Sequence, residues 1–202
     1  MRPIAELLRE GIAAGQFGGD LEPHGDHAMG FFAFSGGDAV ESAHIVDIGS
    51  GAGLPALVLA EAYPETSWTL IERRSGRTDL LRRGVHRLGM SDRVSVIAED
   101  VNAVGHGPLR ASAQFVTARS FGSPADTAEC AGAFLEPGGS LLTSEPKDGD
   151  RETRWPTEQL RELGFVFAEE WTTPSGRYMR FQRNEVEIDH LPRSGARKTP
   201  LF

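Results

Sequence analysis

The chain has 202 residues, of which 39% are hydrophobic, with 24 glycines and a single cysteine. This composition fits one soluble domain of ordinary size and excludes a disordered chain, a collagen-like repeat and a disulfide scaffold. A formal net charge of −8 excludes non-specific coating of nucleic acid, because such binding needs a surplus of Lys and Arg.

Short apolar runs alternate with longer amphipathic segments, which is the pattern of a parallel sheet covered by helices. The sequence predicts a first helix at 5–14. Five strands follow, at 44–48, 68–72, 93–98, 113–118 and 140–144, with helices between them at 54–62, about 79–88 and 124–134. A helix at 157–163 and two strands, at 165–171 and 178–183, complete the predicted elements. Residues 15–37 are Gly-rich and predict no definite element.

The predicted fold class is therefore α/β: a Rossmann-like, mostly parallel, doubly wound sheet that ends in an antiparallel hairpin. Residues 1–43 are expected to form a helical or irregular extension. Residues 44–202 are expected to form the main body of what is a single globular domain overall.

The strand at 44–48 leads into the sequence D-I-G-S-G-A-G-L-P, residues 47–55. Glycines between a strand and a helix let backbone amides face a ligand, because no Cβ blocks the approach. In the dinucleotide fingerprint the third glycine follows three residues after the second, whereas Gly53 follows two after Gly51. Asp47 would repel a diphosphate and attract a cationic amino-acid group. The spacing favours S-adenosylmethionine over NAD(P).

Two further strand ends carry acids. Glu72 closes the second predicted strand, where a carboxylate accepts hydrogen bonds from both ribose hydroxyls of an adenosine. NAD and S-adenosylmethionine sites share this acid, so Glu72 indicates an adenosine ligand without choosing between them. Ala98, Glu99 and Asp100 end the third strand and offer an acid and backbone amides near the adenine, although the two acids equally fit the cap of a following turn.

Several segments resemble the ribosomal RNA small-subunit methyltransferase G (GidB) family, and the resemblance covers about residues 44–201. The glycine loop includes the Leu-Pro tail of that family. The other similar segments are E-R-R-S-G-R-T-D-L-L-R at 72–82, A-E-D at 98–100, V-T-A-R-S at 116–120, L-E-P-G-G-S-L-L at 135–142 and L-P-R-S-G-A-R-K-T-P-L at 191–201.

The resemblance implies a class I methyltransferase that binds S-adenosylmethionine and methylates N7 of a guanine in 16S rRNA. Matching positions imply that Gly49, Leu54, Ala98, Glu99 and Arg119 contact the cofactor or organise the site. With the loop and strand-end reasoning, the full set of candidate cofactor residues is Asp47, Gly49, Ser50, Gly51, Gly53, Leu54, Glu72, Ala98, Glu99 and Arg119.

Methyl transfer mainly requires that the acceptor be positioned. Residues 117–121 lack the N-P-P-Y or D-P-P-Y sequence typical of adenine amino-group methylation, and N7 of guanine needs no general base because it carries no proton. Arg119 and Phe121 are the positioning candidates, the first through a bidentate hydrogen bond and the second by stacking on a base. A structural salt bridge and a core position are the respective alternatives.

The basic residues are concentrated after residue 72, since residues 1–72 hold only two arginines against eleven acids. The candidate contacts to rRNA or the small ribosomal subunit are Arg73, Arg74, Arg77, Arg193, Arg197 and Lys198. A solvated helix face explains most of the arginines in 73–93 equally well.

Two other functions stay open. A relative with a small-molecule acceptor, or one that only binds the cofactor, is credible because residues 1–43 lack the W-N-x-x-x-N-L-T-like segment of the family. An NAD(P)-linked oxidoreductase is disfavoured by the glycine spacing and because neither Tyr63 nor Tyr178 has a lysine four residues on.

The sequence predicts neither a metal site nor a membrane segment. His24 and His27 have the spacing of two ligands, but no further His or Cys follows at matching intervals. Cys130 lies in an Ala-rich segment and is expected to be a buried structural thiol. No run approaches the roughly 20 apolar residues of a membrane span, and residues 1–10 lack a secretory signal, so a cytoplasmic protein is expected.

Overall fold

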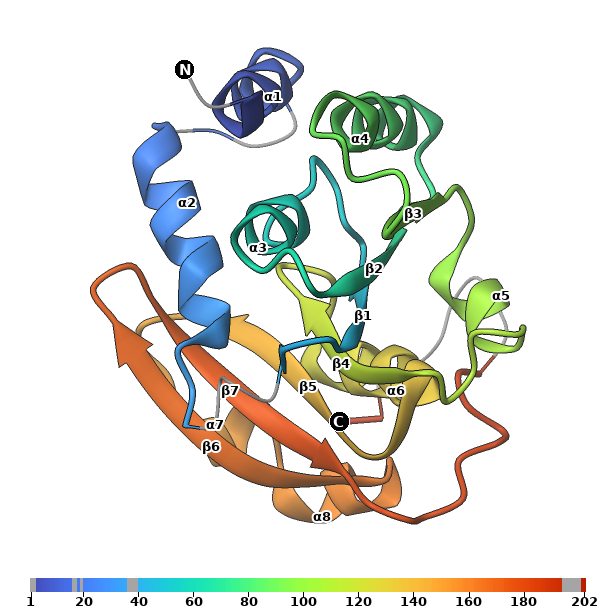
Figure 1. Cartoon of the computed structure of the whole chain (residues 1–202). Coiled ribbons are helices and arrows are strands. Elements are labelled where there is room, and N and C mark those ends of the chain that lie inside the picture. Colours follow the sequence, from blue (N-terminus) through green and yellow to red (C-terminus); the bar gives the residue numbers. More distant parts are fainter. Residues whose placement is uncertain (1–2, 16–17, 19, 36–39, 194–200) are drawn as a thin grey trace.

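The computed structural model describes residues 3–15, 18, 20–35, 40–193 and 201–202, and its centre is a seven-stranded sheet (Figure 1). The strand order is β3-β2-β1-β4-β5-β7-β6. Strands β1 to β5 pair in parallel, and β7 pairs antiparallel with both β5 and β6. The strands are β1 His44–Ile48, β2 Ser67–Ile71, β3 Val94–Ile97, β4 Ala113–Ala118, β5 Leu135–Glu145, β6 Phe165–Thr173 and β7 Gly176–Arg183.

Helices cover both faces of this sheet, as Figure 1 shows. Side chains alternate along each strand, so Ile45 packs on one face of β1 whereas Val46 and Ile48 pack on the other. The first face is covered by α1 Pro3–Ala13, α2 Leu21–Met29, η1 Gly30–Phe32, α3 Ala56–Ala62 and α4 Ser75–Arg87. The second is covered by α5 Val101–Gly105, α6 Pro124–Phe134 and α8 Thr157–Glu162. Helix α7 Arg151–Arg154 precedes α8 and has no buried residue. The predicted doubly wound fold with its C-terminal hairpin is confirmed.

Some elements differ from the predicted ones. Helix α3 begins at Ala56 instead of Leu54, because residues 49–55 form turns. Strand β5 begins at Leu135, which pairs with Ala113, so the predicted Pro-Gly-Gly turn lies inside the strand at an irregular register. The short helices α5 and α7 were not predicted.

Helix α2 fills part of the segment for which the sequence predicts nothing definite. Its Pro23 and Gly25 are weak helix formers, and contacts with the sheet stabilise it instead. The Tyr178 hydroxyl donates to the His27 carbonyl oxygen at 2.8 Å, and a Cβ on Gly30 would lie 2.2 Å from the same hydroxyl oxygen. These contacts fix the C-terminal end of α2 against β7.

In the described part of the chain, no helix has both the length and the apolar character needed to cross a membrane.

Candidate functional site

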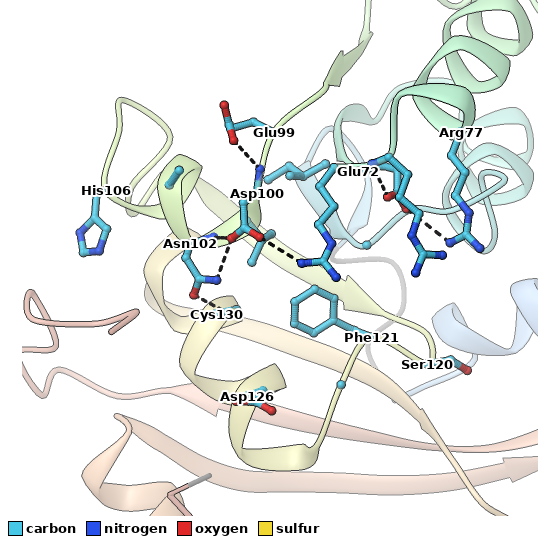
Figure 2. Close-up of a pocket in the computed structure, with 17 residues that line it drawn as sticks. Glu72, Arg77, Glu99, Asp100, Asn102, His106, Ser120, Phe121, Asp126 and Cys130 are labelled. Atoms are coloured by element: carbon cyan, nitrogen blue, oxygen red, sulfur yellow. Dashed lines mark hydrogen bonds and ion pairs between the residues drawn. The ribbon is translucent and has the colours of Figure 1, made fainter. Parts of the chain in front are cut away.

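A cavity of about 860 Å³ opens where the first four parallel strands end (Figure 2). Its walls are Gly49 after β1, Glu72–Arg74 after β2, Glu99 and Asp100 after β3, and Ser120–Gly122 after β4. Ligands of open α/β sheets bind at the carboxyl ends of the strands, where the strand order reverses. Because β2 and β4 lie on opposite sides of β1, this cavity sits at that position.

The Glu72 carboxylate joins the glycine loop to the segment after β2. Its Oε2 accepts the Gly51 N–H at 3.1 Å, and its Oε1 accepts the Arg74 N–H at 2.8 Å. Arg77 Nη1 lies 3.7 Å from Oε2 (Figure 2). Each carboxylate oxygen has a second acceptor position. Glu72 is therefore held rigidly at the cavity wall and keeps acceptor capacity for a ligand.

A buried acid and a partly buried arginine lie behind the loop. Asp47 Oδ1 accepts the Thr117 hydroxyl at 2.6 Å, whereas Asp47 Oδ2 is buried and has no hydrogen-bond partner among the described residues. Arg119 Nη2 donates to His24 Nδ1 at 3.0 Å, and Arg119 Nη1 is likewise buried without a partner in the described chain. Burial raises the pKa of Asp47 to about 7, and the positive charge of Arg119 opposes this rise. A buried polar atom without a hydrogen-bond partner costs folding free energy. These two atoms therefore indicate a position where a ligand binds.

The three glycines of the loop serve different purposes, although all have positive φ: +69° for Gly49, +56° for Gly51 and +94° for Gly53. A Cβ on Gly49 would lie 2.7 Å from Cδ2 of Phe121, whose ring projects into the first cavity (Figure 2). A Cβ on Gly51 would meet nothing closer than 3.8 Å. A Cβ on Gly53 would lie 2.5 Å from Leu57 Cδ1, so Gly53 serves core packing.

The structure places only some of the predicted site residues in the walls of the first cavity. Gly49, Glu72, Glu99 and Phe121 line the first cavity. The other candidates stand outside its walls: Asp47, Ser50, Gly51, Gly53, Leu54, Ala98 and Arg119. Ser50 donates its hydroxyl to the Asp47 carbonyl oxygen at 2.9 Å, which fixes the turn.

Sequence reasoning missed the wall made by α5 and α6. Asp100 caps α5, because its Oδ1 accepts the Asn102 N–H at 2.9 Å, so the capping alternative for this acid is confirmed. Asn102 lines the cavity from α5 and His106 from the position just after it, and Asp126 and Cys130 line the cavity from α6 (Figure 2). Cys130 is buried as predicted and donates to Asn102 Oδ1 at 3.5 Å. Asp100 follows a strand and precedes a short apolar run, and this pattern in the sequence could have predicted the helix that forms part of this wall.

A second cavity of about 350 Å³ lies at the ends of β4 and β5. It shares Ser120, Phe121 and Gly122 with the first cavity, so the two meet at this segment. Ser120 adopts a left-handed backbone conformation at φ +52°, which is uncommon outside glycine and often marks functional sites. The other walls include Arg119, Thr143–Pro146, Arg154, Trp155 and, from α2, His27.

A family model described as rRNA small subunit methyltransferase G (GidB) matches residues 30–165. The chain belongs to this family. Curated rRNA small subunit methyltransferases G from Syntrophomonas wolfei and Sorangium cellulosum are 31% and 30% identical to it, over 72% and 74% of this chain. These matches cover 66% and 62% of the two relatives, so the chain spans less than two thirds of their length.

Solved structures show the same class I methyltransferase fold. An RNA methyltransferase from Salinibacter ruber in complex with S-adenosyl-L-homocysteine superposes with a TM-score of 0.59 at 17% identity, over 84% of this chain and 96% of that one. An S-adenosyl-L-methionine-dependent methyltransferase from Methanococcus maripaludis gives a TM-score of 0.60 at 16% identity, over 92% of both chains. The predicted fold class and family resemblance are confirmed.

In this GidB chain, only some of the basic residues that were predicted to contact RNA lie at the first cavity. Arg73, Arg74 and Arg77 line the first cavity, where Arg73 Nη1 lies 3.6 Å from Asp100 Oδ2. Arg193 is paired instead with the fully buried Glu129, because its Nη2 and Nε donate to Glu129 Oε2 at 2.8 and 3.1 Å. Arg197 and Lys198 lie outside the described residues.

Arg193→Met is expected to lower the free energy of unfolding by about 2 kcal/mol, because it leaves the buried Glu129 carboxylate without its ion-pair partner. The loss is modest because the Arg193 side chain is partly exposed, and solvent screens the ion pair. Urea denaturation at pH 7 measures the change. Glu129→Gln combined with Arg193→Met is expected to recover part of the loss, since no buried charge then remains. Equal stability of Arg193→Met and the parent protein would contradict this structural assignment.

The histidines of α2 do not form a metal site in the part of the chain that the structure describes, where no group of three or more His, Cys, Asp or Glu side chains could hold an ion. His24 Nε2 donates to the Gly18 carbonyl oxygen at 2.7 Å while Nδ1 accepts from Arg119. His27 lines the second cavity, and burial lowers its pKa to about 4. His27 is therefore uncharged at neutral pH.

Proposed function

We propose that this GidB protein is an S-adenosylmethionine-dependent methyltransferase that methylates N7 of a guanine in 16S rRNA. The observation that carries the cofactor assignment is the pair of buried atoms without partners in the described chain, Asp47 Oδ2 and Arg119 Nη1. They belong to the ends of the adjacent strands β1 and β4 and carry opposite charges. The methionine part of S-adenosylmethionine has an α-ammonium and an α-carboxylate, which match this pair.

The adenosine part fits the remaining strand ends. Glu72 holds acceptor positions for the ribose hydroxyls at the end of β2, and Glu99 and Asp100 line the cavity at the end of β3. Gly51 leaves room for a ligand against the backbone, since even a Cβ added there would have no neighbour closer than 3.8 Å, whereas Gly49 lies against the Phe121 ring at the first cavity. Ser50, Gly53, Leu54 and Ala98 then contribute through the shape of the loop and the third strand end.

The bound cofactor supplies an electrophilic methyl group, which N7 accepts with its lone pair while the bond to sulfur breaks and leaves its electrons on sulfur. The chain need not remove a proton, because N7 carries none. Ser120–Gly122, which line both cavities, orient the two partners in line, and the Phe121 ring excludes water between them. Arg119 and Phe121 act as positioning residues in this proposal.

The RNA substrate is supported by the names of the relatives and by the arginines at the first cavity. Arg73, Arg74 and Arg77 provide cations beside the site that can contact a phosphate backbone. Arg197 and Lys198 are proposed to add contacts, and the side chain of Arg193 stays partly exposed while it pairs with Glu129. A 16S rRNA substrate implies that the protein acts in the cytoplasm.

The test incubates the protein with methyl-labelled S-adenosylmethionine and small ribosomal subunits from cells that lack this methylation. Label in 16S rRNA at a heat-labile N7-methylguanine is expected. Calorimetry is expected to show binding of S-adenosylmethionine and none of NADH. Cofactor binding without labelled rRNA would favour a small-molecule acceptor, and NADH binding would favour an oxidoreductase.

The affinity for S-adenosylmethionine is expected to fall as the pH drops from 8 to 6. Asp47 in the free protein has a pKa of about 7, because burial disfavours its charged form, and only the carboxylate attracts the ammonium. Below pH 7 binding must therefore remove a proton, which costs up to about tenfold in affinity for each pH unit. Titration calorimetry in buffers of different ionisation enthalpy measures both the affinity and the released proton. A pH-independent affinity would contradict the role of Asp47.

A further inference from the structure

The second cavity adjoins the first cavity, which is proposed to hold the cofactor, at the shared segment Ser120–Gly122. Direct methyl transfer requires that the acceptor atom and the methyl carbon meet, so N7 must lie at Ser120–Gly122. The cavity volume of about 350 Å³ is at the lower end of ligand pockets and suits one base turned out of its helix. The rest of the base then extends toward Thr143–Pro146, the end of β5.

At that end of β5 lies a buried carboxylate that is incompletely paired. The Glu145 side chain is only 2% exposed and lines the second cavity. Its Oε2 accepts Arg154 Nε at 2.7 Å, whereas its Oε1 has a long contact of 3.4 Å with the Thr143 hydroxyl. An ionised carboxylate can accept about four hydrogen bonds. Oε1 is thus an acceptor available to a ligand in the cavity.

We propose that this cavity binds the acceptor guanine and that Glu145 recognises its N1–H and 2-amino groups. This inference rests on the proposed function. In guanine the 2-amino group lies on the opposite side of the base from N7, so a base with N7 at Ser120–Gly122 turns its two donors toward β5. Adenine presents an acceptor at N1 and no amino group at C2, and a carboxylate that can only accept would repel it.

The charge of Glu145 also suits the transfer itself. The methyl group carries a positive charge from sulfur to the base, and a carboxylate against the base interacts more strongly with the cationic product than with neutral guanine. His27 lines the same cavity in its neutral form and so adds no opposing cation, whereas Arg119, which also lines the cavity, is a cation that the proposed function assigns to the cofactor carboxylate. Arg154 pairs with Glu145 through Oε2, and its own side chain is 37% exposed, so solvent weakens its effect on the carboxylate.

Glu145→Gln is expected to slow single-turnover methyl transfer to 16S rRNA by roughly 10- to 100-fold, because a hydrogen bond from a donor to a charged acceptor is lost. S-adenosylmethionine affinity and the melting temperature are expected to stay unchanged. The matched control is Glu170→Gln, which also removes a carboxylate paired with an arginine, Arg177 at 2.7 Å, but lies outside both cavities. The control is expected to transfer methyl groups at the parental rate.

A second measurement separates recognition from a structural role. The target guanosine, located by mapping the label, is replaced by inosine, which keeps N7 and N1–H but lacks the 2-amino group. The parent protein is expected to prefer guanosine by roughly tenfold, and Glu145→Gln is expected to lose that preference. Parent protein that methylates both substrates equally would overturn the inference, even if the variant failed to fold.

The outcomes for the two proposals can be told apart. If the parent protein leaves N7 of every 16S guanine unlabelled, the proposed function fails and the guanine assignment fails with it. If the parent labels a guanine N7 but Glu145→Gln is equally active, the function stands and only the role of Glu145 is overturned.

Discussion

Asp47→Asn is expected to weaken S-adenosylmethionine binding by about 100-fold while leaving the protein folded. Asp47 Oδ2 is buried without a partner in the described chain, and its negative charge is the attraction that the cofactor ammonium would find there. Removal of one member of a buried charge pair costs about 2–5 kcal/mol of binding free energy. The asparagine retains an oxygen that can accept the Thr117 hydroxyl, so the strand ends are expected to stay in place.

The same substitution should raise the stability of the free protein at alkaline pH. Burial raises the pKa of Asp47 to about 7, above its unfolded value near 3.8, so the folded state loses stability as pH rises through this range. Asparagine has no charge to bury. The variant is therefore expected to be more stable than the parent by a few kcal/mol at pH 8 and nearly equal to it at pH 4.

Urea denaturation at the two pH values and calorimetry with S-adenosylmethionine check both effects. Asp79→Asn is the matched control, because Asp79 is 60% exposed on α4 and pairs only at 3.7 Å with Arg82. This control should change neither affinity nor stability. Unchanged affinity in Asp47→Asn would reject the placement of the cofactor ammonium, whatever the stability shows.

The parallel part of the sheet could be predicted from sequence because its strands are short, mostly apolar runs. His44–Ile48 and Ala113–Ala118 are buried on both faces, and each is followed by a helix that begins after a turn residue. The first cavity was partly predictable for the same reason, since the ends of parallel strands lie at one edge. Glu72 and Glu99 were found because they lie within two residues of the ends of such strands.

The second cavity could not be predicted because its walls are far apart in the chain. His27 comes from a helix with poor intrinsic propensity, and it is held there by Tyr178, 151 residues later. Glu145 lies beyond the predicted end of its strand, at a position that pairs with Arg177 of β7. No local pattern encodes either contact. The roles of the three loop glycines could not be predicted either, since only the structure shows that Gly49 borders a cavity and that Gly53 packs against the core.

Gly49→Ala is expected to abolish at least about 99% of methyl transfer at a modest cost in stability. The new Cβ would lie 2.7 Å from Cδ2 of Phe121, which borders both cavities and is only partly buried, so the ring must move at the junction of the two cavities, which is the proposed meeting place of cofactor and acceptor. A Cβ at φ +69° costs about 1–2 kcal/mol in backbone strain. The double variant Gly49→Ala with Phe121→Leu is expected to regain cofactor affinity, because the smaller side chain relieves the contact.

Gly53→Ala, further along the same loop, should behave in the opposite manner. Its Cβ would lie 2.5 Å from Leu57 Cδ1 and 3.2 Å from Leu81 Cδ2, both in the closely packed core, so the clash cannot be relieved into a cavity. We expect a loss of about 3–4 kcal/mol in unfolding free energy, from strain at φ +94° together with overpacking. Where the variant remains folded at low temperature, calorimetry should show nearly parental cofactor affinity. Similar losses of affinity in both variants would mean that the loop acts as one rigid unit, and that Gly49 has no special place at the junction of the cavities.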